Sequence, residues 1–230
     1  FKRSGDAHAI DKNLPEVNAA NFKLPAISND RLGVILYTSG TSGQPKGVML
    51  QLNSLAANIR FAREHIKLQP KDRIVSFLPL AHCYGCAFDF LYPLTLGCHT
   101  IFLGKLPSPQ VILKAFGEYK PRLILSVPLV LEKIYKGKLK PTLDKPIVKF
   151  LTKIPGIREL LYKKINNTLS EAFGGNFLEL VLGGAKMSRE VEIFLQKIKF
   201  RFTVGYGMTE CGPLVSYCDW STTKPLSTSQ

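Results

Sequence analysis

The sequence predicts an α/β fold in which a mostly parallel sheet is flanked by helices. Short apolar runs bounded by turn residues alternate along the chain with longer stretches of helical spacing. This alternation is typical of a parallel sheet covered by helices. The predicted strands are 32–37, 73–78, 100–103, 122–127, 178–182 and 202–205. The predicted helices are 53–65, 83–94, 108–119, 128–135, 155–173 and 188–197.

Local signals support individual elements in this order. The first strand is indicated by the apolar run 34–36, which is followed at once by turn residues. The third helix starts with Ser108 as a capping residue and Pro109, which the first helical turn accepts. Residues 137–149 contain two prolines and are predicted to be an irregular insertion. The last helix begins at Ser188 and has two glutamates in its first turn, where the helix dipole favours them.

The domain organisation expected from these elements is one α/β domain over residues 31–220. A chain of 230 residues is long enough for one sizeable domain or two small ones. Residues 1–30 are polar and interrupted by prolines, which predicts an extended lead-in, and residues 221–230 are predicted to be a truncated polar tail. Because the chain starts at Phe1 without an initiator methionine, we expect it to be part of a longer protein.

Basic residues dominate the charge of the chain. Lys and Arg number 31 against 17 Asp and Glu, which gives a net charge of +14. This excess fits nucleic acid, an anionic membrane surface or anionic ligands. Much of it lies in residues 133–164, whose apolar residues recur at helical spacing, as in a solvated helical face or a basic amphipathic surface on anionic lipid. No stacking-aromatic signature is present in the sequence, so no nucleic acid partner is expected.

The cysteines and the hydropathy pattern bear on the cellular setting. No window of the sequence approaches the ~18–20 apolar residues of a membrane span, and the first residues lack the apolar core of a signal peptide. The five cysteines have no regular spacing, which favours a reduced, cytoplasmic setting with at most peripheral membrane contact. Cys83 and Cys86 form a CxxC pair, but a zinc site needs a second close pair.

Residues 37–47 consist almost entirely of glycines, hydroxyl side chains and one cation. Glycines let the backbone approach a ligand closely, so that successive N–H groups line an anion-binding nest. The hydroxyls add donors, and Lys46 adds a full positive charge. The sequence therefore predicts a phosphate-binding loop. Its candidate residues are Thr38, Ser39, Gly40, Thr41, Ser42, Gly43 and Lys46.

Two common phosphate-binding patterns do not match this loop. The P-loop of ATPases requires glycine directly before the lysine and Ser or Thr directly after it. Here Pro45 precedes Lys46 and Gly47 follows it. The loop also lacks the first glycine of the Rossmann pattern, because Thr38 occupies that position. A flexible linker rich in Gly, Ser and Thr is the alternative, although the apolar run 34–36 favours a loop that leaves a buried strand.

Three further segments with candidate ligand groups also follow predicted strands. Residues 79–82, 183–185 and 206–210 come directly after the second, fifth and sixth predicted strands. In parallel sheets, ligands bind beyond the carboxyl ends of the strands. We therefore expect these segments and the phosphate loop to form one composite active site.

These four segments resemble motifs of the adenylate-forming superfamily, which includes acyl-CoA synthetases, luciferases and peptide-synthetase adenylation domains. Residues 37–47 resemble its phosphate-binding signature, and residues 78–84 resemble its histidine-bearing motif. Residues 183–185 are similar to the segment that flanks the adenine, and 206–210 are similar to the motif that holds the nucleotide and its magnesium. The order of the motifs agrees, and the segments look most like those of long-chain fatty acyl-CoA synthetases.

The resemblance implies ATP-dependent activation of a fatty acid to an acyl-adenylate and then to an acyl-CoA, with Mg²⁺ and coenzyme A. It assigns catalytic roles to Lys46, His82, Thr209 and Glu210, and Glu210 is the implied magnesium ligand. The implied nucleotide-binding residues beyond the phosphate loop are Gly183, Gly184, Ala185, Tyr206, Gly207, Met208 and Thr209. The family's ribose-binding aspartate, hinge and C-terminal domain are not identifiable, so we expect a fragment of the large N-terminal domain that does not turn over by itself.

Several assignments have alternatives at this point. His82 also fits a structural group after a strand, and Tyr206 also fits a core aromatic residue. Residues 83–94 fit either the wall of an acyl tunnel or ordinary core. For the chain as a whole, the alternatives are a non-catalytic module that binds phosphate or anionic lipid, and adenylation of an aryl or amino acid.

Overall fold

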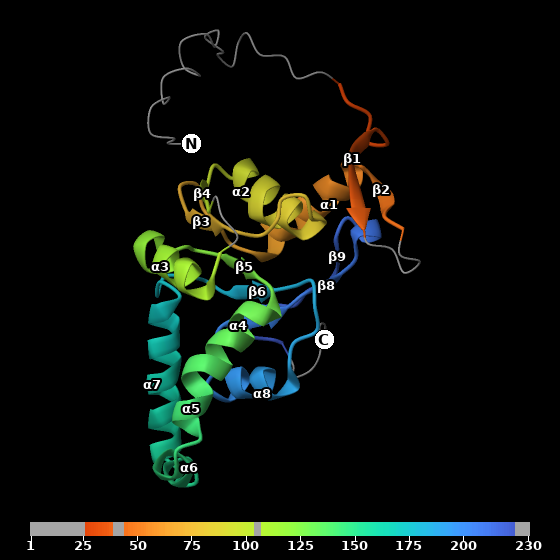
Figure 1. Cartoon of the computed structure of the whole chain (residues 1–230). Helices are drawn as coiled ribbons and strands as arrows, with labels where there is room; N and C mark the ends of the chain where they lie inside the picture. The colour runs from red at the N-terminus through yellow and green to blue at the C-terminus, as the bar shows by residue number, and fades with distance from the viewer. Residues whose placement is uncertain (1–25, 39–43, 104–106, 224–230) are drawn as a thin grey trace.

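The computed structural model describes residues 26–38, 44–103 and 107–223 (Figure 1). Every predicted strand and helix has a counterpart in it. The elements are β1 (Leu32–Thr38), β2 (Lys46–Gln51), α1 (Leu52–His65), β3 (Arg73–Ser76), η1 (Gly85–Leu91), α2 (Tyr92–Thr95), β4 (His99–Phe102), α3 (Pro109–Tyr119), β5 (Ile124–Ser126), α4 (Pro128–Ile134), η2 (Tyr135–Leu139), α5 (Lys140–Leu143), α6 (Pro146–Leu151), α7 (Ile157–Ala172), β6 (Leu180–Leu182), α8 (Arg189–Lys197), β7 (Phe202–Val204), β8 (Tyr206–Gly207), η3 (Thr209–Cys211) and β9 (Leu214–Ser216).

Parallel strands form the centre of the molecule, as predicted. β5, β6 and β7 make a parallel ladder in which β6 is central. β3 and β4 make a second parallel pair. A parallel bridge between Ile74 of β3 and Leu123, the residue before β5, joins the two groups. The resulting order of parallel strands is β4-β3-β5-β6-β7.

Two hydrophobic cores lie on opposite faces of these strands. Because side chains alternate along a strand, Ile124 and Leu125 of β5 belong to different cores. The core that contains Ile124 lies against α3, α4, α7 and α8, and the core that contains Leu125 lies against α1 and η1 (Figure 1). In the described ranges, no helix combines the length and apolar character of a membrane span.

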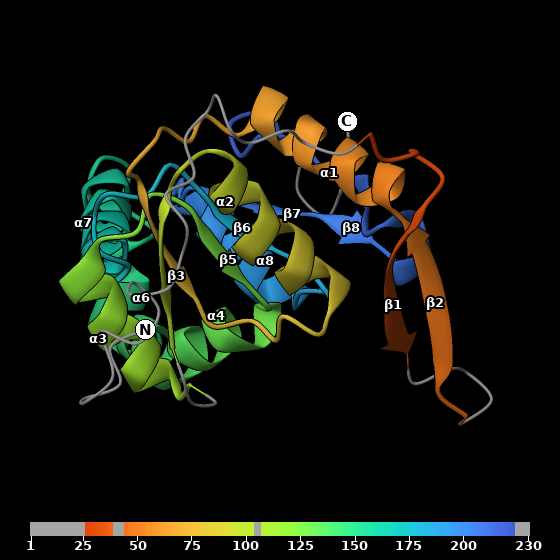
Figure 2. The ribbon, with the colours of Figure 1, turned by 90° about the horizontal axis from the view of Figure 1, so that it is seen from above.

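The phosphate loop does not follow a strand of the parallel sheet, which corrects the expectation that all four motifs share one parallel rim. β1 pairs with β2 in an antiparallel hairpin that projects beside the parallel strands (Figure 2). The residues between β1 and β2 are too few for a parallel crossover, which needs a dozen or more. Strand β2 was not predicted. Ser39, Gly40, Thr41, Ser42 and Gly43 lie outside the described residues.

Residues 137–149 are largely helical, so the predicted irregular insertion is wrong. The chain continues from α4 through the π-helical η2 into α5, and α6 follows after a short break. Pro141 and Pro146 stand in the first turns of α5 and α6. At Pro146 the first turn of α6 leaves backbone N–H groups without helical partners, so this proline removes no helical hydrogen bond.

Asp89 of η1 is a buried carboxyl group that holds the segment after β3. Its side chain is 0% exposed, and its Oδ2 accepts a hydrogen bond from the backbone N–H of Leu78 at 3.3 Å. Burial raises the pKa of Asp89 to about 7, although hydrogen bonds from Ser76 and from the backbone of Leu78 and Phe77 act in the opposite direction. A hydrogen bond therefore connects the residues after β3, which lead to His82, to η1, a helix that packs in the core containing Leu125.

Replacing Asp89 with Asn should remove a pH-dependent loss of stability. The folded chain keeps the Asp89 proton up to about pH 7, whereas an unfolded chain releases it near pH 4. Between these values the folded state binds more protons, so the contribution of Asp89 to the free energy of unfolding falls as pH rises. The free energy of unfolding should be measured with denaturant at about pH 5 and about pH 8 for both proteins. The difference between them should change in favour of Asp89→Asn at the higher pH. A difference between the two proteins that does not vary with pH would contradict this account.

Candidate functional site

A cavity of about 760 Å³ lies at the carboxyl ends of β5, β6 and β7. Its walls come from α1, from the segments that follow β3 and β6, and from the chain that runs from β7 to β9. The predicted site residues that line it are His82, Gly183, Gly184, Ala185, Tyr206, Gly207, Met208 and Thr209. Three of the four motif segments therefore meet at one cavity.

The segment after β6 is held close to Tyr84. The Tyr84 hydroxyl donates to the backbone oxygen of Val181 at 3.1 Å. A Cβ on Gly183 would stand 3.2 Å from the Tyr84 ring, so a side chain at Gly183 would displace this ring. Gly184 has a φ of +80°, a conformation that glycine adopts without strain. The two glycines thus allow a backbone surface to face the cavity beside an aromatic ring.

The segment after β7 forms a short antiparallel pair. Tyr206 and Gly207 make up β8, which pairs with β9. The backbone N–H of Met208 donates to the oxygen of Pro213 at 2.9 Å. A Cβ on Gly207 would lie 2.1 Å from the same oxygen, so this turn requires glycine. The Tyr206 side chain is 54% exposed, which rules out the core alternative for this residue.

Asn58 of α1 positions the same segment, and the sequence analysis missed it. Its side-chain nitrogen donates to the backbone oxygens of Ser54 at 2.9 Å and Cys211 at 3.4 Å. Its side-chain oxygen accepts from the backbone N–H of Leu214 at 2.8 Å. Asn58 is only 8% exposed. A buried amide on the apolar face of a predicted helix is the signal that could have identified it, because buried polar groups require partners.

A second cavity, of about 200 Å³, lies between the end of β1 and η3. Its lining includes Thr38, at the start of the phosphate loop, together with His82 and Thr209. His82 and Thr209 also line the larger cavity, so the two cavities share a wall. The hairpin therefore brings the base of the phosphate loop to the carboxyl ends of the parallel strands, although it belongs to a different sheet.

His82 has a defined ring orientation at this shared wall. Its Nδ1 accepts a hydrogen bond from the backbone N–H of Tyr84 at 3.3 Å. In the neutral ring, Nδ1 is then the unprotonated nitrogen and Nε2 carries the proton. The His82 side chain is exposed, so it is not a structural group satisfied within the core.

An apolar wall completes the larger cavity. Tyr217 lies edge-on to Phe61 with ring centroids 6.0 Å apart, and its hydroxyl donates to the buried Glu179. Burial raises the pKa of Glu179 to about 7, and the hydrogen bond from Tyr217 opposes this shift. Several of the lining residues were not predicted from the sequence. They are Phe61, Ala62, Ile66, Leu125, Val181, Met187, Lys186, Arg189 and Tyr217.

Residues 83–94 contribute to the core that contains Leu125 and to the larger cavity, and an acyl tunnel along them stays a prediction. Phe88 lines the larger cavity, whereas Tyr92 is fully buried in the core that contains Leu125. Two predicted charged residues line neither cavity. Lys46 is exposed at the start of β2, opposite Thr38 in the ladder, and Glu210 is exposed directly after Thr209. Among the described residues, no cluster of three or more metal-binding side chains occurs.

The chain is similar in sequence to long-chain acyl-CoA synthetases. Long-chain-fatty-acid–CoA ligase 1 of Saccharomyces cerevisiae is 32% identical over 206 residues, covering 79% of this chain and 28% of that protein. Long chain acyl-CoA synthetase 5 of Arabidopsis thaliana is 27% identical over 228 residues, covering 88% of this chain and 33% of that protein. The chain thus spans about a third of the length of these relatives.

The fold and the family are also shared with known proteins. ATP-bound MatB from Rhodopseudomonas palustris superposes with a TM-score of 0.64 at 22% identity, covering 89% of this chain and 34% of that one. At this identity the likeness concerns the fold. The family described as AMP-binding enzyme matches residues 3–229 of the 230. The chain therefore belongs to the AMP-binding enzymes, the adenylate-forming family.

Proposed function

We propose that the complete protein joins a long-chain fatty acid to coenzyme A in an ATP-dependent reaction that passes through an acyl-adenylate. The main support is one cavity in which glycine backbone and a threonine lie near an apolar wall. Such a cavity suits a ligand that is polar at one end and hydrocarbon at the other. The similar yeast protein is named for this reaction.

We assign the adenosine end of the ligand to the segments after β6 and β7. Gly184 has no side chain, and a Cβ there would meet only Val127 at 3.9 Å, which leaves room for a flat ring beside this backbone. Tyr206 offers an exposed aromatic face on which the adenine can stack. Thr209 is near enough to both cavities to donate a hydrogen bond to the α-phosphate or to the acyl carboxylate.

We assign the β- and γ-phosphates to the second cavity and to the phosphate loop that begins at Thr38. Thr38, Ser39, Gly40, Thr41, Ser42 and Gly43 would supply hydroxyl and backbone donors, and Lys46 would add charge after a movement toward the cavity. Glu210 fits a magnesium site, since Mg²⁺ commonly takes one or two carboxylates together with phosphate oxygens. When bound, the ion would neutralise part of the phosphate charge.

The chemistry asked of this chain is mainly positioning and charge stabilisation. A carboxylate oxygen of the fatty acid attacks the α-phosphorus of ATP, the bond to the β-phosphate oxygen breaks, and pyrophosphate leaves. In the second step the coenzyme A sulfur attacks the acyl carbonyl carbon, and AMP leaves. Holding the reacting atoms in place lowers both barriers. His82 lines both cavities, so its Nε2–H would be available to donate a hydrogen bond to the acyl carboxylate.

Calorimetric titration should distinguish binding at the adenosine end of the site from binding at the β- and γ-phosphate end. We expect residues 1–230 to bind a non-hydrolysable fatty acyl-adenylate mimic and Mg-ATP, and to bind the guanosine analogues more weakly. The variant Lys46→Ala/Glu210→Gln should weaken the binding of Mg-ATP by about tenfold or more, which is about 1.4 kcal/mol of binding free energy. The same variant should change binding of the mimic by less than about threefold, because the mimic has no β- or γ-phosphate.

The matched control for this titration is Lys114→Ala/Glu118→Gln on α3, which makes the same charge changes away from both cavities. It should leave both affinities unchanged. Equal binding of adenosine and guanosine compounds would favour a general anion-binding module over an adenylating enzyme. Robust ATP-dependent thioester formation by residues 1–230 alone would contradict the expectation that this fragment does not turn over.

Gly183→Ala should weaken binding of the acyl-adenylate mimic by about tenfold, because the added methyl group would push the Tyr84 ring out of position. Gly117→Ala is the matched control. A Cβ at Gly117 meets nothing within 4 Å, so this change in α3 should leave binding unaltered and stabilise the helix by up to about 1 kcal/mol. Unchanged affinity of a folded Gly183→Ala variant would show that the segment after β6 is not part of the ligand site.

A further inference from the structure

One end of the molecule exposes apolar side chains far from the cavity. This end, here called the α6 tip, comprises residues 145–164 and lies at the bottom of Figure 1, where α6 meets the start of α7. Its most exposed apolar side chains are Ile147 at 74%, Phe150 at 64% and Leu160 at 70%. Large apolar side chains gathered at one end in this way indicate a contact surface.

Helix α6 differs from the amphipathic helices that cover the sheet. Its sequence, Pro-Ile-Val-Lys-Phe-Leu, is mostly apolar, yet none of its residues is buried. Ile147 and Phe150 are three residues apart and lie on one face, and Leu160 stands three residues after the partly exposed Ile157 on α7. The face of α6 that carries Ile147 and Phe150 is therefore left uncovered by the described residues.

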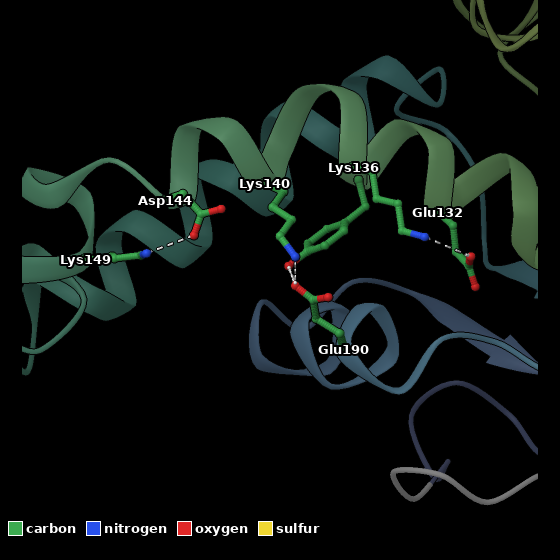
Figure 3. Close-up of polar contacts among 7 residues, drawn as sticks. Glu132, Lys136, Lys140, Asp144, Lys149 and Glu190 are labelled. Atoms are coloured by element: carbon green, nitrogen blue, oxygen red, sulfur yellow. Dashed lines mark hydrogen bonds and ion pairs between the residues drawn. The ribbon is translucent and has the colours of Figure 1, made fainter.

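Basic side chains surround the exposed apolar ones. Residues 145–164 contain six Lys or Arg and one Glu. Lys149 pairs with Asp144 at 3.0 Å, and Lys140 pairs with Glu190 of α8 at 2.7 Å, which fixes the base of the tip (Figure 3). In contrast, Lys145, Lys153 and Lys163 are exposed and make no ion pair with any described residue. Their charge is available to an external anionic surface.

We propose that the α6 tip is a docking surface for an anionic lipid bilayer. Ile147, Phe150 and Leu160 would enter the boundary between headgroups and acyl chains. Lys145, Lys153 and Lys163 would lie at the level of the lipid phosphates and carboxylates. Apolar side chains bordered by unpaired lysines match the two attractive forces that a bilayer surface offers, apolar burial and its negative potential. A protein partner of low charge would gain nothing from these lysines.

Vesicle co-sedimentation tests this proposal. Residues 1–230 should pellet with phosphatidylcholine vesicles that contain about 30 mol% phosphatidylserine, and not with phosphatidylcholine alone. Ile147→Ser/Phe150→Ser/Leu160→Ser and, separately, Lys145→Gln/Lys153→Gln/Lys163→Gln should each lower the partition coefficient by about tenfold or more. All these side chains are exposed, so circular dichroism should show folded variants.

Matched controls distinguish the tip from bulk properties of the chain. Leu94→Ser/Val111→Ser/Leu129→Ser removes three other exposed apolar side chains, which are 60%, 49% and 57% exposed. Lys67→Gln/Lys114→Gln/Lys197→Gln makes the same change in net charge. Both should pellet like the parent chain. The proposal is wrong if the parent does not pellet with the anionic vesicles, or if the controls lose as much binding as the tip variants. A change from dimer to monomer on the apolar substitutions would assign the tip to self-association instead.

Discussion

Register-matched hydrogen bonds between β5, β6 and β7 are the constraint on which the candidate site depends. Ser126 lies opposite Leu182, and Leu182 lies opposite Val204, so the three strands end at the same level. The ladder continues one residue further, because Gly183 N–H donates to Ser126 and Gly205 N–H donates to Leu182. The sheet itself thus brings the segments after β6 and β7 to one cavity.

Buried polar side chains then orient the segments that leave the sheet. Tyr84 holds the backbone of β6, Asn58 holds the chain between η3 and β9, and Asp89 holds the segment after β3. Each of these bonds contributes little net free energy, but leaving a buried partner unsatisfied costs about 1–3 kcal/mol. The same groups that complete the core therefore restrict the backbone around the cavity.

Most of the fold could be predicted from the sequence, because parallel strands that are buried on both faces have short continuous apolar sequences. Strand β2 was missed although Val48, Met49 and Leu50 form such a run, because this run directly follows the loop motif and was not separated from it. The helices around Pro141 and Pro146 were missed although prolines also occur in first turns. Motif residues such as Tyr206 were placed correctly at the cavity. Asn58 was not found, because its partners are far along the chain and local periodicity contains no information about them.

Photoaffinity labelling with a 2-azido analogue of ATP, followed by peptide mapping, tests the central claim most directly. If the segments after β6 and β7 form the adenosine site, the label should appear on residues 183–187 and 205–209, and ATP should protect them better than GTP. Labelling that spreads over the basic residues 133–164, or that GTP prevents as well as ATP does, would contradict the placement of the site.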